Sequence, residues 1–323
     1  MGGERLFELR RRTFDTPHFR GIEFIEVEAR SIINHVPGTY LPFNWTINPY
    51  RGCSHACSYC FARVTHTYMD MDAGRDFESK IVVKVNAAQL LRRELRAKRW
   101  TGEHIAMGTA TDPYQRAEGR YRLMPAIIES LAEVGNPFSI LTKGTLVLRD
   151  LELLADAATR ADVSTALSIG TLDEDAWRRS EPGTPHPRRR IDAVAKLNSA
   201  GVACGVMVAP VLPGISDRPE QLREVVEAAL DAGATHVSPI LLHLRPGVKE
   251  VYMRWLEDNY PDLVGRYQSM YRKSAYASPK QTEALAATIG DLVEAAGPRA
   301  RSARRRAGHR RELTPQSEQL ELF

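Results

Sequence analysis

The sequence predicts an α/β protein organised as a partial (β/α)6 barrel of the TIM type. From residue 44 onward, short apolar runs rich in β-branched residues alternate with amphipathic stretches of helical period. This alternation is typical of parallel strands joined by right-handed helical crossovers. Polar and reactive residues follow the carboxyl ends of the runs, where barrels place their functional groups. A doubly wound open sheet fits the same periodicity, and its binding crevice lies at the same strand ends.

Six runs are expected to form the strands of the barrel, because they are almost continuously apolar, as strands buried on both faces are. They are residues 44–48, 104–109, 138–142, 163–169, 203–209 and 236–242. Helices are predicted at 87–99, 188–200 and 221–233, the last ending at a glycine. A further apolar run, KIVVKV at 80–85, is expected at a sheet edge or as a segment leading into the barrel.

The chain divides into four parts by composition. Residues 1–43 are expected to form an N-terminal extension packed on the body, and residues 44–248 the barrel. Residues 249–297 have the pattern of C-terminal helices. Residues 298–323 are predicted to be a disordered, arginine-rich tail that ends in QLELF, because they offer nothing to bury.

Composition and charge narrow the class of protein. The chain has 323 residues, of which 43% are hydrophobic and 26% charged, which excludes collagen, coiled coil and disorder along the whole length. No run reaches the roughly 18 apolar residues of a membrane span, and the start lacks an apolar export core, so a cytoplasmic protein without membrane contact is expected. Seven arginines and three glutamates in the tail account for the net charge of +4, which leaves residues 1–297 neutral.

Three of the four cysteines form the strongest motif. Cys53, Cys57 and Cys60 stand in RGCSHACSYCFAR, directly after the first predicted strand. Thiolates are the ligands that iron–sulfur clusters and zinc require, and an odd cluster in a cytosolic chain argues against disulfides. Three thiolates can hold three irons of a cubane and leave the fourth open to a small molecule. Zinc is the alternative, with His55 or His66 completing its ligand set.

The spacing Cys-x3-Cys-x2-Cys after the first strand of a six-unit β/α chain resembles the radical S-adenosylmethionine (SAM) superfamily. Further segments follow one another as in its spore-photoproduct-lyase-like (DNA repair photolyase-like) branch, over roughly residues 45–245. They are TINPYRGCSHACSYCFAR, GTATDPYQRAE, LTKG, LSIGTLDEDAWRRSEPGTPHPRRRIDAVAKLNSAG and GVMVAPVLPGISD. The resemblance implies an enzyme whose 4Fe-4S cluster cleaves SAM reductively to a 5′-deoxyadenosyl radical, which abstracts hydrogen from a substrate.

The resemblance also implies residues that bind the cofactor. Tyr59 occupies the aromatic position that packs near the adenine in this family, and Ala209 matches the adenine-contacting strand end. Lys143 in LTKG and Arg190 in PRRRI match groups that meet the SAM carboxylate, and Ser168 matches a serine that hydrogen-bonds SAM. A solvated loop lysine and a small residue before a glycine turn are the structural alternatives for Lys143 and Ser168.

Thr109, Thr111 and Asp112 in GTATDPY match a segment that, by the resemblance, helps orient the SAM amino group or the substrate, although Asp-Pro is also a common turn opener. Spore photoproduct lyases hold, at the position of Thr109, the cysteine that returns a hydrogen atom to the product radical. A threonine O–H bond is too strong for that role. The remaining cysteine, Cys204, lies in a predicted strand and is expected to be a buried structural thiol. The sequence therefore argues against repair of spore photoproduct.

For the substrate and the partners, the sequence indicates a chemical class. Nucleic acid is the favoured substrate class, and the alternatives are radical modification of a small molecule or protein, or a non-catalytic metal- or cluster-binding module tethered to DNA. An electron donor of the flavodoxin or ferredoxin type is the expected redox partner. The tail arginines suit phosphate contacts with DNA. The terminal QLELF resembles peptides by which bacterial repair proteins dock on the replication sliding clamp.

Overall fold

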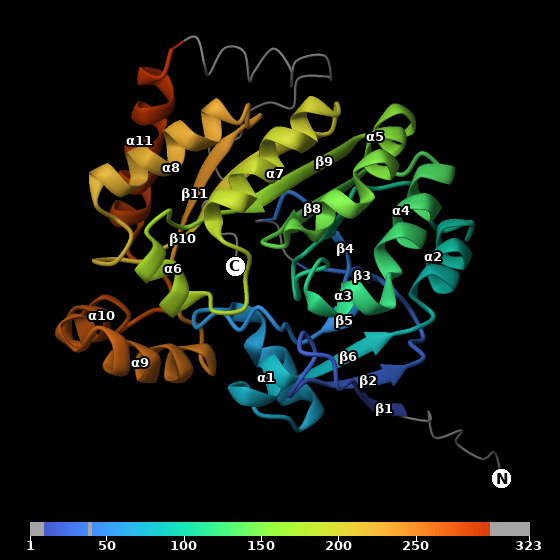
Figure 1. Ribbon diagram of the computed structural model, residues 1–323, viewed down its shortest axis with the longest axis horizontal. Coiled ribbons are helices and arrows are strands. Elements are labelled where there is room, and N and C mark those ends of the chain that lie inside the picture. Colours follow the sequence, from blue (N-terminus) through green and yellow to red (C-terminus); the bar gives the residue numbers. More distant parts are fainter. Residues whose placement is uncertain (1–9, 38–40, 298–323) are drawn as a thin grey trace.

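Two β-sheets frame the protein, and the larger one carries the predicted barrel strands (Figure 1). The structure is a computed structural model that describes residues 10–37 and 41–297, so the predictions for the arginine-rich tail and QLELF lie outside the described residues. The larger sheet has the order β11-β10-β9-β8-β7-β4-β3. Its strands are β3 (Ile33–His35), β4 (Trp45–Ile47), β7 (Ile105–Met107), β8 (Phe138–Thr142), β9 (Val163–Ser168), β10 (Ala203–Val211) and β11 (Val237–Leu241).

The six predicted strands correspond to β4 and β7 to β11, and all neighbouring pairs among them are parallel. Their spatial order follows the chain without reversal. A doubly wound sheet reverses its order at a switch point, so the observed order identifies the barrel arrangement. Of the described strands in this sheet, only β3 runs antiparallel, along the outer edge of β4. Within the described ranges β3 and β11 are not paired with each other, which makes the barrel open.

The smaller sheet has the order β1-β2-β6-β5 and is built largely from the N-terminal part of the chain. Its strands are β1 (Arg10–Thr13), β2 (Glu23–Val27), β5 (Tyr50–Arg51) and β6 (Lys80–Lys84). The run KIVVKV forms β6 between β2 and β5, so the expectation of an edge or leading segment is wrong. The reason is packing: Ile81 and Val83 are fully buried against Phe24 and Tyr50 in a small core of their own.

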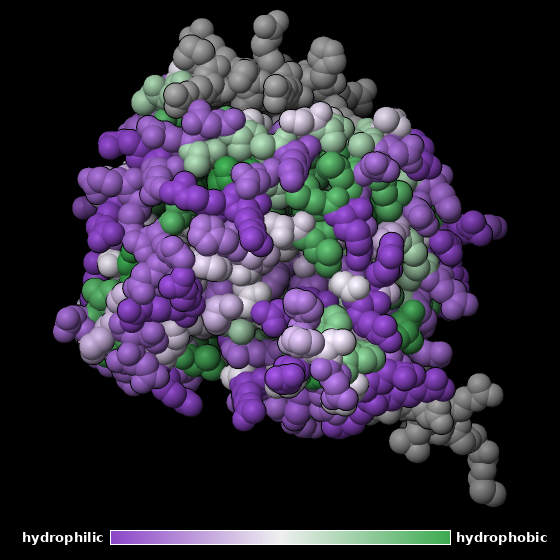
Figure 2. Space-filling model, in the orientation of Figure 1, coloured by the Kyte–Doolittle hydropathy of each residue, from purple (hydrophilic) through white to green (hydrophobic). Residues whose placement is uncertain are grey.

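Helices cover the outer face of the larger sheet and follow its strands in order (Figure 1). They are α2 (Ala87–Leu95), α4 (Leu123–Glu133), α5 (Leu151–Arg160), α7 (Pro187–Ser199) and α8 (Pro219–Asp231). Polar residues cover most of the face seen in Figure 2, as expected when the apolar sides of the helices face the sheet. None of the helices in the described part of the chain is long and apolar enough to cross a membrane.

Shorter elements connect the strands or extend the chain. The connecting elements are η1 (Phe61–Met69), α1 (Arg75–Ser79), α3 (Arg116–Tyr121), η2 (Thr145–Asp150) and α6 (Glu174–Ser180). The C-terminal elements are α9 (Val248–Asn259), η3 (Pro261–Leu263), α10 (Val264–Met270) and α11 (Pro279–Ala295). Helix α11 begins at a capping box, in which the Ser278 side chain accepts from the backbone N–H of Gln281. It packs on α8 and β11 and so closes the end of the sheet.

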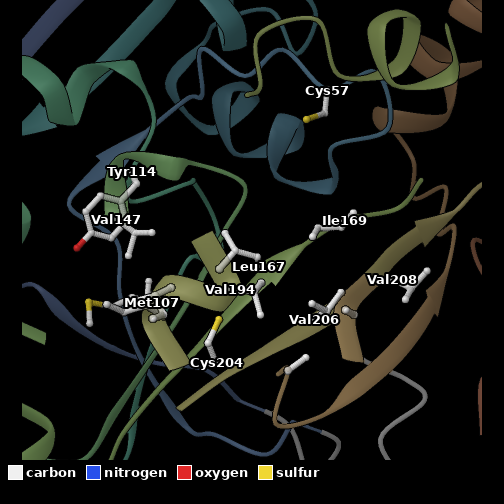
Figure 3. Packing of buried hydrophobic residues seen from close by; sticks show 14 of the residues in the cluster. Cys57, Met107, Tyr114, Val147, Leu167, Ile169, Val194, Cys204, Val206 and Val208 are labelled. Atoms are coloured by element: carbon white, nitrogen blue, oxygen red, sulfur yellow. The ribbon is translucent and has the colours of Figure 1, made fainter. Parts of the chain in front are cut away.

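The main core lies between the sheet and its covering helices. Leu167, Val194 and Val206 are fully buried there, and Figure 3 shows them around Cys204. Cys204 is itself fully buried, and burial raises the pKa of its thiol to about 12. The expectation of a structural thiol in a strand agrees with this position.

A buried polar network joins the smaller sheet to the barrel. Glu118 on α3 has no exposed surface and accepts from the Tyr50 hydroxyl on β5 at 2.5 Å and from Arg149 on η2 at 2.6 Å. Its carboxylate also accepts the backbone N–H groups of Leu123 and Met124. Burial raises the pKa of Glu118, which these hydrogen bonds oppose. A carboxylate this dehydrated is stable only while its partners remain.

We predict that Glu118→Ala lowers the free energy of unfolding by about 3–5 kcal/mol, because it leaves buried donors unpaired and separates the two sheets. Urea denaturation followed by circular dichroism measures the change. The control is Glu174→Ala, which removes the exposed Glu174–Arg178 pair and should cost less than about 1 kcal/mol. Equal losses of unfolding free energy in the two variants would show that the burial of Glu118 does not increase the cost of its removal.

Candidate functional site

An open cleft lies at the carboxyl ends of β7 to β11. One wall is the loop that holds the cysteine motif, and the other walls are strand ends. This is the position that the barrel arrangement predicts for a site. The lining residues from the loop include Cys53, His55, Cys57, Tyr59 and Cys60, and those from the strand ends include Gly108, Thr111, Asp112, Lys143, Ser168, Met207, Ala209, Leu242 and His243.

The cysteine loop turns sharply, and glycine is required where it begins. Gly52 has φ +80°, and a Cβ there would lie 2.8 Å from the His66 ring and 2.9 Å from the carbonyl oxygens of Phe77 and Lys80. Ala56, between the first two cysteines of the motif, also has a left-handed φ of 54°. The turn brings Cys53, Cys57 and the more exposed Cys60 to the cleft wall, and in Figure 3 Cys57 lies apart from the strands that carry Leu167 and Cys204.

The TDPYQ segment after β7 holds the first half of this loop. Gln115 is fully buried, donates to the carbonyl of Gly52 at 2.8 Å and accepts from the backbone N–H of Ser54 at 2.9 Å. The hydroxyl of Thr111 donates to the same Gly52 carbonyl at 2.7 Å. The backbone on both sides of Cys53 is therefore fixed by side chains from the next strand end.

The segment after α6 holds the second half of the loop. The backbone N–H of Ser58 donates to the carbonyl of Ser180 at 2.9 Å, and that of Gly183 donates to the carbonyl of His55 at 3.0 Å. A Cβ at Gly183 would lie 2.2 Å from the carbonyl oxygen of Ser54, so only glycine permits this approach. The SEPG segment thus fits closely against the cysteine motif.

The thiols of the cysteine loop lie at the wall of the cleft, where burial governs their protonation. Burial is the main reason that the pKa values of Cys53, Cys57 and Cys60 are all raised, so the thiols stay neutral unless a bound cation displaces their protons. No group of three or more His, Cys, Asp or Glu side chains in the described ranges is arranged to hold one metal ion. A cubane binds each cysteine at a different iron and does not require convergence on one point.

The histidines proposed for a zinc set are engaged elsewhere. His66 is fully buried against Phe77, with Nε2 2.9 Å from the carbonyl of Lys80, and it does not line the cleft. His55 does line the cleft, but its Nδ1 lies 3.3 Å from Asp112 Oδ2. This geometry does not favour the zinc alternative.

A group of polar residues, termed the polar wall, lies beside the cleft and consists of Lys143, Ser168, Glu181 and Arg190. Glu181 lies at its centre and was not identified from the sequence. Its buried carboxylate accepts from Arg190 at 2.5 Å, from Lys143 at 2.9 Å and from the hydroxyl of Tyr59. Burial alone would raise the pKa of Glu181, but Arg190 and Lys143 outweigh it and lower that pKa well below its ordinary range. Two cations and one carboxylate leave a net positive charge beside the cleft.

Lys143 is held in one position by this wall. Its Nζ donates to Ser168 Oγ at 2.8 Å, to Glu181 Oε1 at 2.9 Å and to the carbonyl of Ala209 at 3.1 Å. Ser168 in turn donates to Ala209 at 2.7 Å. Three residues predicted from different strand ends, Lys143, Ser168 and Ala209, therefore meet at one point on the cleft.

Asp112 lines the cleft and also holds neighbouring residues in position. It accepts from the Thr142 hydroxyl at 2.5 Å and from the Lys143 backbone N–H at 2.7 Å, and it pairs with His55. Although burial opposes ionisation, His55 and these hydrogen bonds lower the pKa of Asp112. Asp112 thus links the cysteine loop to the end of β8.

Two predicted cofactor contacts do not reach the cleft. Thr109 is turned toward Asn48, with 3.3 Å between its hydroxyl and the Asn48 amide nitrogen, and does not line the cleft. Arg190 has no exposed surface and uses its guanidinium on Glu181, Thr184 and the carbonyls of Pro185 and Ser168. In this structure Arg190 contacts the carboxylate of Glu181 and does not line the cleft, so its contact with a carboxylate of SAM stays a prediction.

The site residues that were not identified from the sequence act by holding other site residues in position. Glu181, Gln115 and Gly183 hold the lysine or the cysteine loop, and each lies far along the chain from what it holds. The segment SEPGT, with its carboxylate between two arginine-rich stretches and its glycine, was the available sequence signal for Glu181 and Gly183.

Comparison with known proteins agrees with this geometry. A family model described as the radical SAM superfamily matches residues 47–229. An uncharacterised protein of Mycobacterium tuberculosis strain H37Rv is 48% identical over 283 residues, which are 87% of this chain and 83% of that protein. A protein of Pseudomonas phage M6 named radical SAM Nα-GlyT isomerase is 27% identical over 191 residues, which cover 58% of this chain and 37% of that protein.

Among solved structures, a spore photoproduct lyase complexed with dinucleoside spore photoproduct has the same fold. Its TM-score is 0.63 at 17% identity, covering 85% of this chain and 80% of that chain. This likeness confirms the predicted partial-barrel fold.

We predict that Glu181 and Lys143 are strongly coupled in stability. Glu181→Gln alone leaves the buried Arg190 and the partly buried Lys143 without their carboxylate and should cost about 3–5 kcal/mol of unfolding free energy. The double variant with Lys143→Met should cost at least about 1 kcal/mol less than the sum of the two single variants. Denaturant unfolding of the four proteins measures this cycle, and additive losses would show that the pair does not interact.

Proposed function

This chain belongs to the radical SAM superfamily, whose members use a 4Fe-4S cluster and SAM, and we propose that the cleft described above binds both. The observation that carries the proposal is the meeting of the three-cysteine loop with the Lys143 wall across one cleft. The proposed cluster ligands are Cys53, Cys57 and Cys60. When bound, the cluster supplies the electron that cleaves SAM to a 5′-deoxyadenosyl radical.

The chain's own residues would bind and orient SAM. Lys143 and Ser168 offer an ammonium and a hydroxyl to a carboxylate, and the net positive charge of the wall favours an anion. Tyr59 and Ala209 line the cleft where a flat adenine would lie, and Asp112 offers an acceptor to an amino group. Arg190 keeps Glu181 charged, so that Lys143 stays in place.

The domain boundaries proposed from the sequence place the proposed cofactor-binding residues in one segment. The segment 44–248 contains every residue assigned to the cluster or to SAM. Residues 1–43 contribute to the smaller sheet and the edge of the larger one, and 249–297 to the helices beside β11. A flavodoxin or ferredoxin is the proposed electron donor in a cytoplasmic setting.

Nucleic acid is the proposed substrate class. A structure of the same fold holds a dinucleoside photoproduct, and the arginine-rich tail would add sequence-independent phosphate contacts. The terminal QLELF is proposed to dock on a sliding clamp. Thr109 stands in place of the hydrogen-donating cysteine and is turned toward Asn48, so repair of spore photoproduct is not the proposed reaction.

Two other functions compete with this proposal. Radical modification of a small molecule or a protein would use the same cofactor wall and differ only in substrate. A non-catalytic cluster- or metal-binding module would need the cysteines alone, whereas Lys143, Ser168 and Ala209 also converge on the cleft. We therefore favour the enzyme.

We predict that anaerobic reconstitution gives about four irons and four sulfides per chain, and that Cys53→Ala, Cys57→Ala and Cys60→Ala each lose most of the iron and all SAM cleavage. Iron and sulfide assays with detection of 5′-deoxyadenosine measure both. Cys204→Ala is the matched control and should retain the full iron content, because Cys204 lies in the core. One tightly held zinc without sulfide would refute the assignment.

We predict that Lys143→Ala weakens SAM binding by at least about tenfold, because it removes a charged hydrogen-bond donor from the cleft. Calorimetric titration with SAM measures this without turnover, and the iron content should change little. Lys84→Ala, which removes a buried lysine on β6 outside the cleft, should leave the affinity unchanged. If Lys143→Ala bound SAM normally, the role given to the wall would be wrong.

A further inference from the structure

The side of the cleft formed by the end of β11 carries aromatic rings and cations that the proposed cofactor sites do not use. His243 lines the cleft, and its ring packs edge-on against Tyr276 with the centroids 4.7 Å apart. Arg245 donates to the hydroxyl of Tyr276 at 2.7 Å, with its guanidinium 5.8 Å from the ring centroid. The three side chains form one half-buried cluster at the edge of the cleft.

Two more cations are brought to this cluster by the chain after α10. The backbone N–H of Leu244 donates to the carbonyl of Ala275 at 2.8 Å, and Lys249 Nζ donates to the carbonyl of Tyr271 at 2.7 Å. These contacts hold the segment 271–276 beside 243–249. The exposed residues Arg272 and Lys273 lie within that segment.

The charge of this surface differs from that of the body as a whole. Residues 1–297 are neutral overall, whereas the two adjoining segments contain Arg245, Lys249, Arg272 and Lys273 and no acidic residue. Glu250 follows directly, but its carboxylate accepts the backbone N–H of Gly247 at the start of α9. The surface is therefore locally basic. Behind it the cleft is apolar, lined by Met207, Pro210, Ile240, Leu241 and Leu242.

We propose that this surface, termed the mouth surface and defined as His243, Arg245, Lys249, Arg272, Lys273 and Tyr276, binds the backbone of a single-stranded nucleic acid and directs one base into the cleft. The inference rests on the proposed function and names where its substrate is held. Cations that follow a backbone, aromatic rings beside them and an apolar recess for an unstacked base are the features by which proteins bind single strands.

An acidic protein segment is the competing ligand for a basic surface. Its carboxylates would be satisfied by the cations alone and would leave the rings and the apolar recess without a role. A base uses all three features, because it has a flat apolar face and a phosphate on either side. The combination favours nucleic acid.

The first experiment measures binding of a thymine-rich single-stranded 12-mer by fluorescence anisotropy over a range of salt concentrations. All proteins are full-length chains in which the seven tail arginines are replaced by serine, so that tail contacts do not contribute. Arg272→Ala/Lys273→Ala should weaken binding several-fold and make the slope of log K against log salt shallower by about 1.4, the value for two phosphate contacts to a single strand.

The matched control is Lys98→Ala/Arg99→Ala. This is also an exposed adjacent pair of cations, but it precedes β7 and so lies toward the opposite end of the sheet from the cleft. The control should leave both the affinity and the salt slope unchanged. Equal effects of the two pairs would overturn the proposal, because binding would then reflect overall charge alone.

The second experiment tests the ring of Tyr276. Tyr276→Leu removes the ring and should weaken oligonucleotide binding by about tenfold, whereas Tyr276→Phe keeps the ring and should weaken it less. Equal losses of affinity in Tyr276→Leu and Tyr276→Phe would show that the ring does not stack on a base and would overturn the proposal. Competition by polyglutamate as effective as by unlabelled oligonucleotide would assign the surface to an acidic protein and overturn the proposal.

Failure of this inference is distinguishable from failure of the proposed function. Reductive SAM cleavage to 5′-deoxyadenosine without added nucleic acid is measured on the unaltered protein beside its oligonucleotide affinity. Cleavage without oligonucleotide binding would overturn the mouth surface and leave the radical SAM function in place. Binding that depends on Arg272, Lys273 and Tyr276 without SAM cleavage would support the surface and contradict the function.

Discussion

The carboxylate of Glu181 is the interaction on which the arrangement of the cleft depends. It lies between the buried Arg190, the partly buried Lys143 and a tyrosine hydroxyl, and Lys143 is the charged group that the cleft presents. Two cations this close and this short of water would repel each other, so the anion between them is needed to hold both in place. A glutamate on the segment after α6 thereby fixes a lysine at the end of β8 and a tyrosine in the cysteine loop. The cleft is shaped by charge pairing as much as by the barrel backbone.

Much of the fold could be predicted from the sequence because the barrel strands are short, apolar and regularly spaced. All six were placed correctly, since strands buried on both faces need little beyond apolar side chains. The smaller sheet was not predicted: β1 is the polar run RRRT, exposed at every position, and it exists only because it pairs with β2. A strand that is held by backbone pairing and buries none of its side chains has no apolar periodicity from which it could be recognised.

The residues of the candidate site also fall into two groups, those that could be predicted from the sequence and those that could not. The three cysteines were identified from their spacing, and Lys143 and Ser168 from their places at strand ends and the resemblance of their motifs, because each of these signals lies within one segment. Glu181 and Gln115 were not, since a residue that holds another is recognised only when both are in place. Arg190 illustrates the limit: its position at the start of α7 was identified, but whether its guanidinium meets a ligand or a neighbouring carboxylate depends on Glu181. Reactive groups can be predicted locally, whereas the contacts that orient them cannot.

The hydrogen bonds between the cysteine loop and the segment after α6 have a consequence for biosynthesis. The loop at residues 53–60 leaves the ribosome more than a hundred residues before Ser180 and Gly183, which hold its second half. A nascent chain that has emerged only as far as β9 therefore contains Thr111 and Gln115, which hold the first half of the loop, but not the residues that hold its second half. Metal delivered at that stage would meet a loop held on one side of the motif, whereas metal delivered after α6 has been synthesised would meet a loop held on both sides. The folded chain thus offers its three thiols in a more fixed arrangement than the nascent chain does.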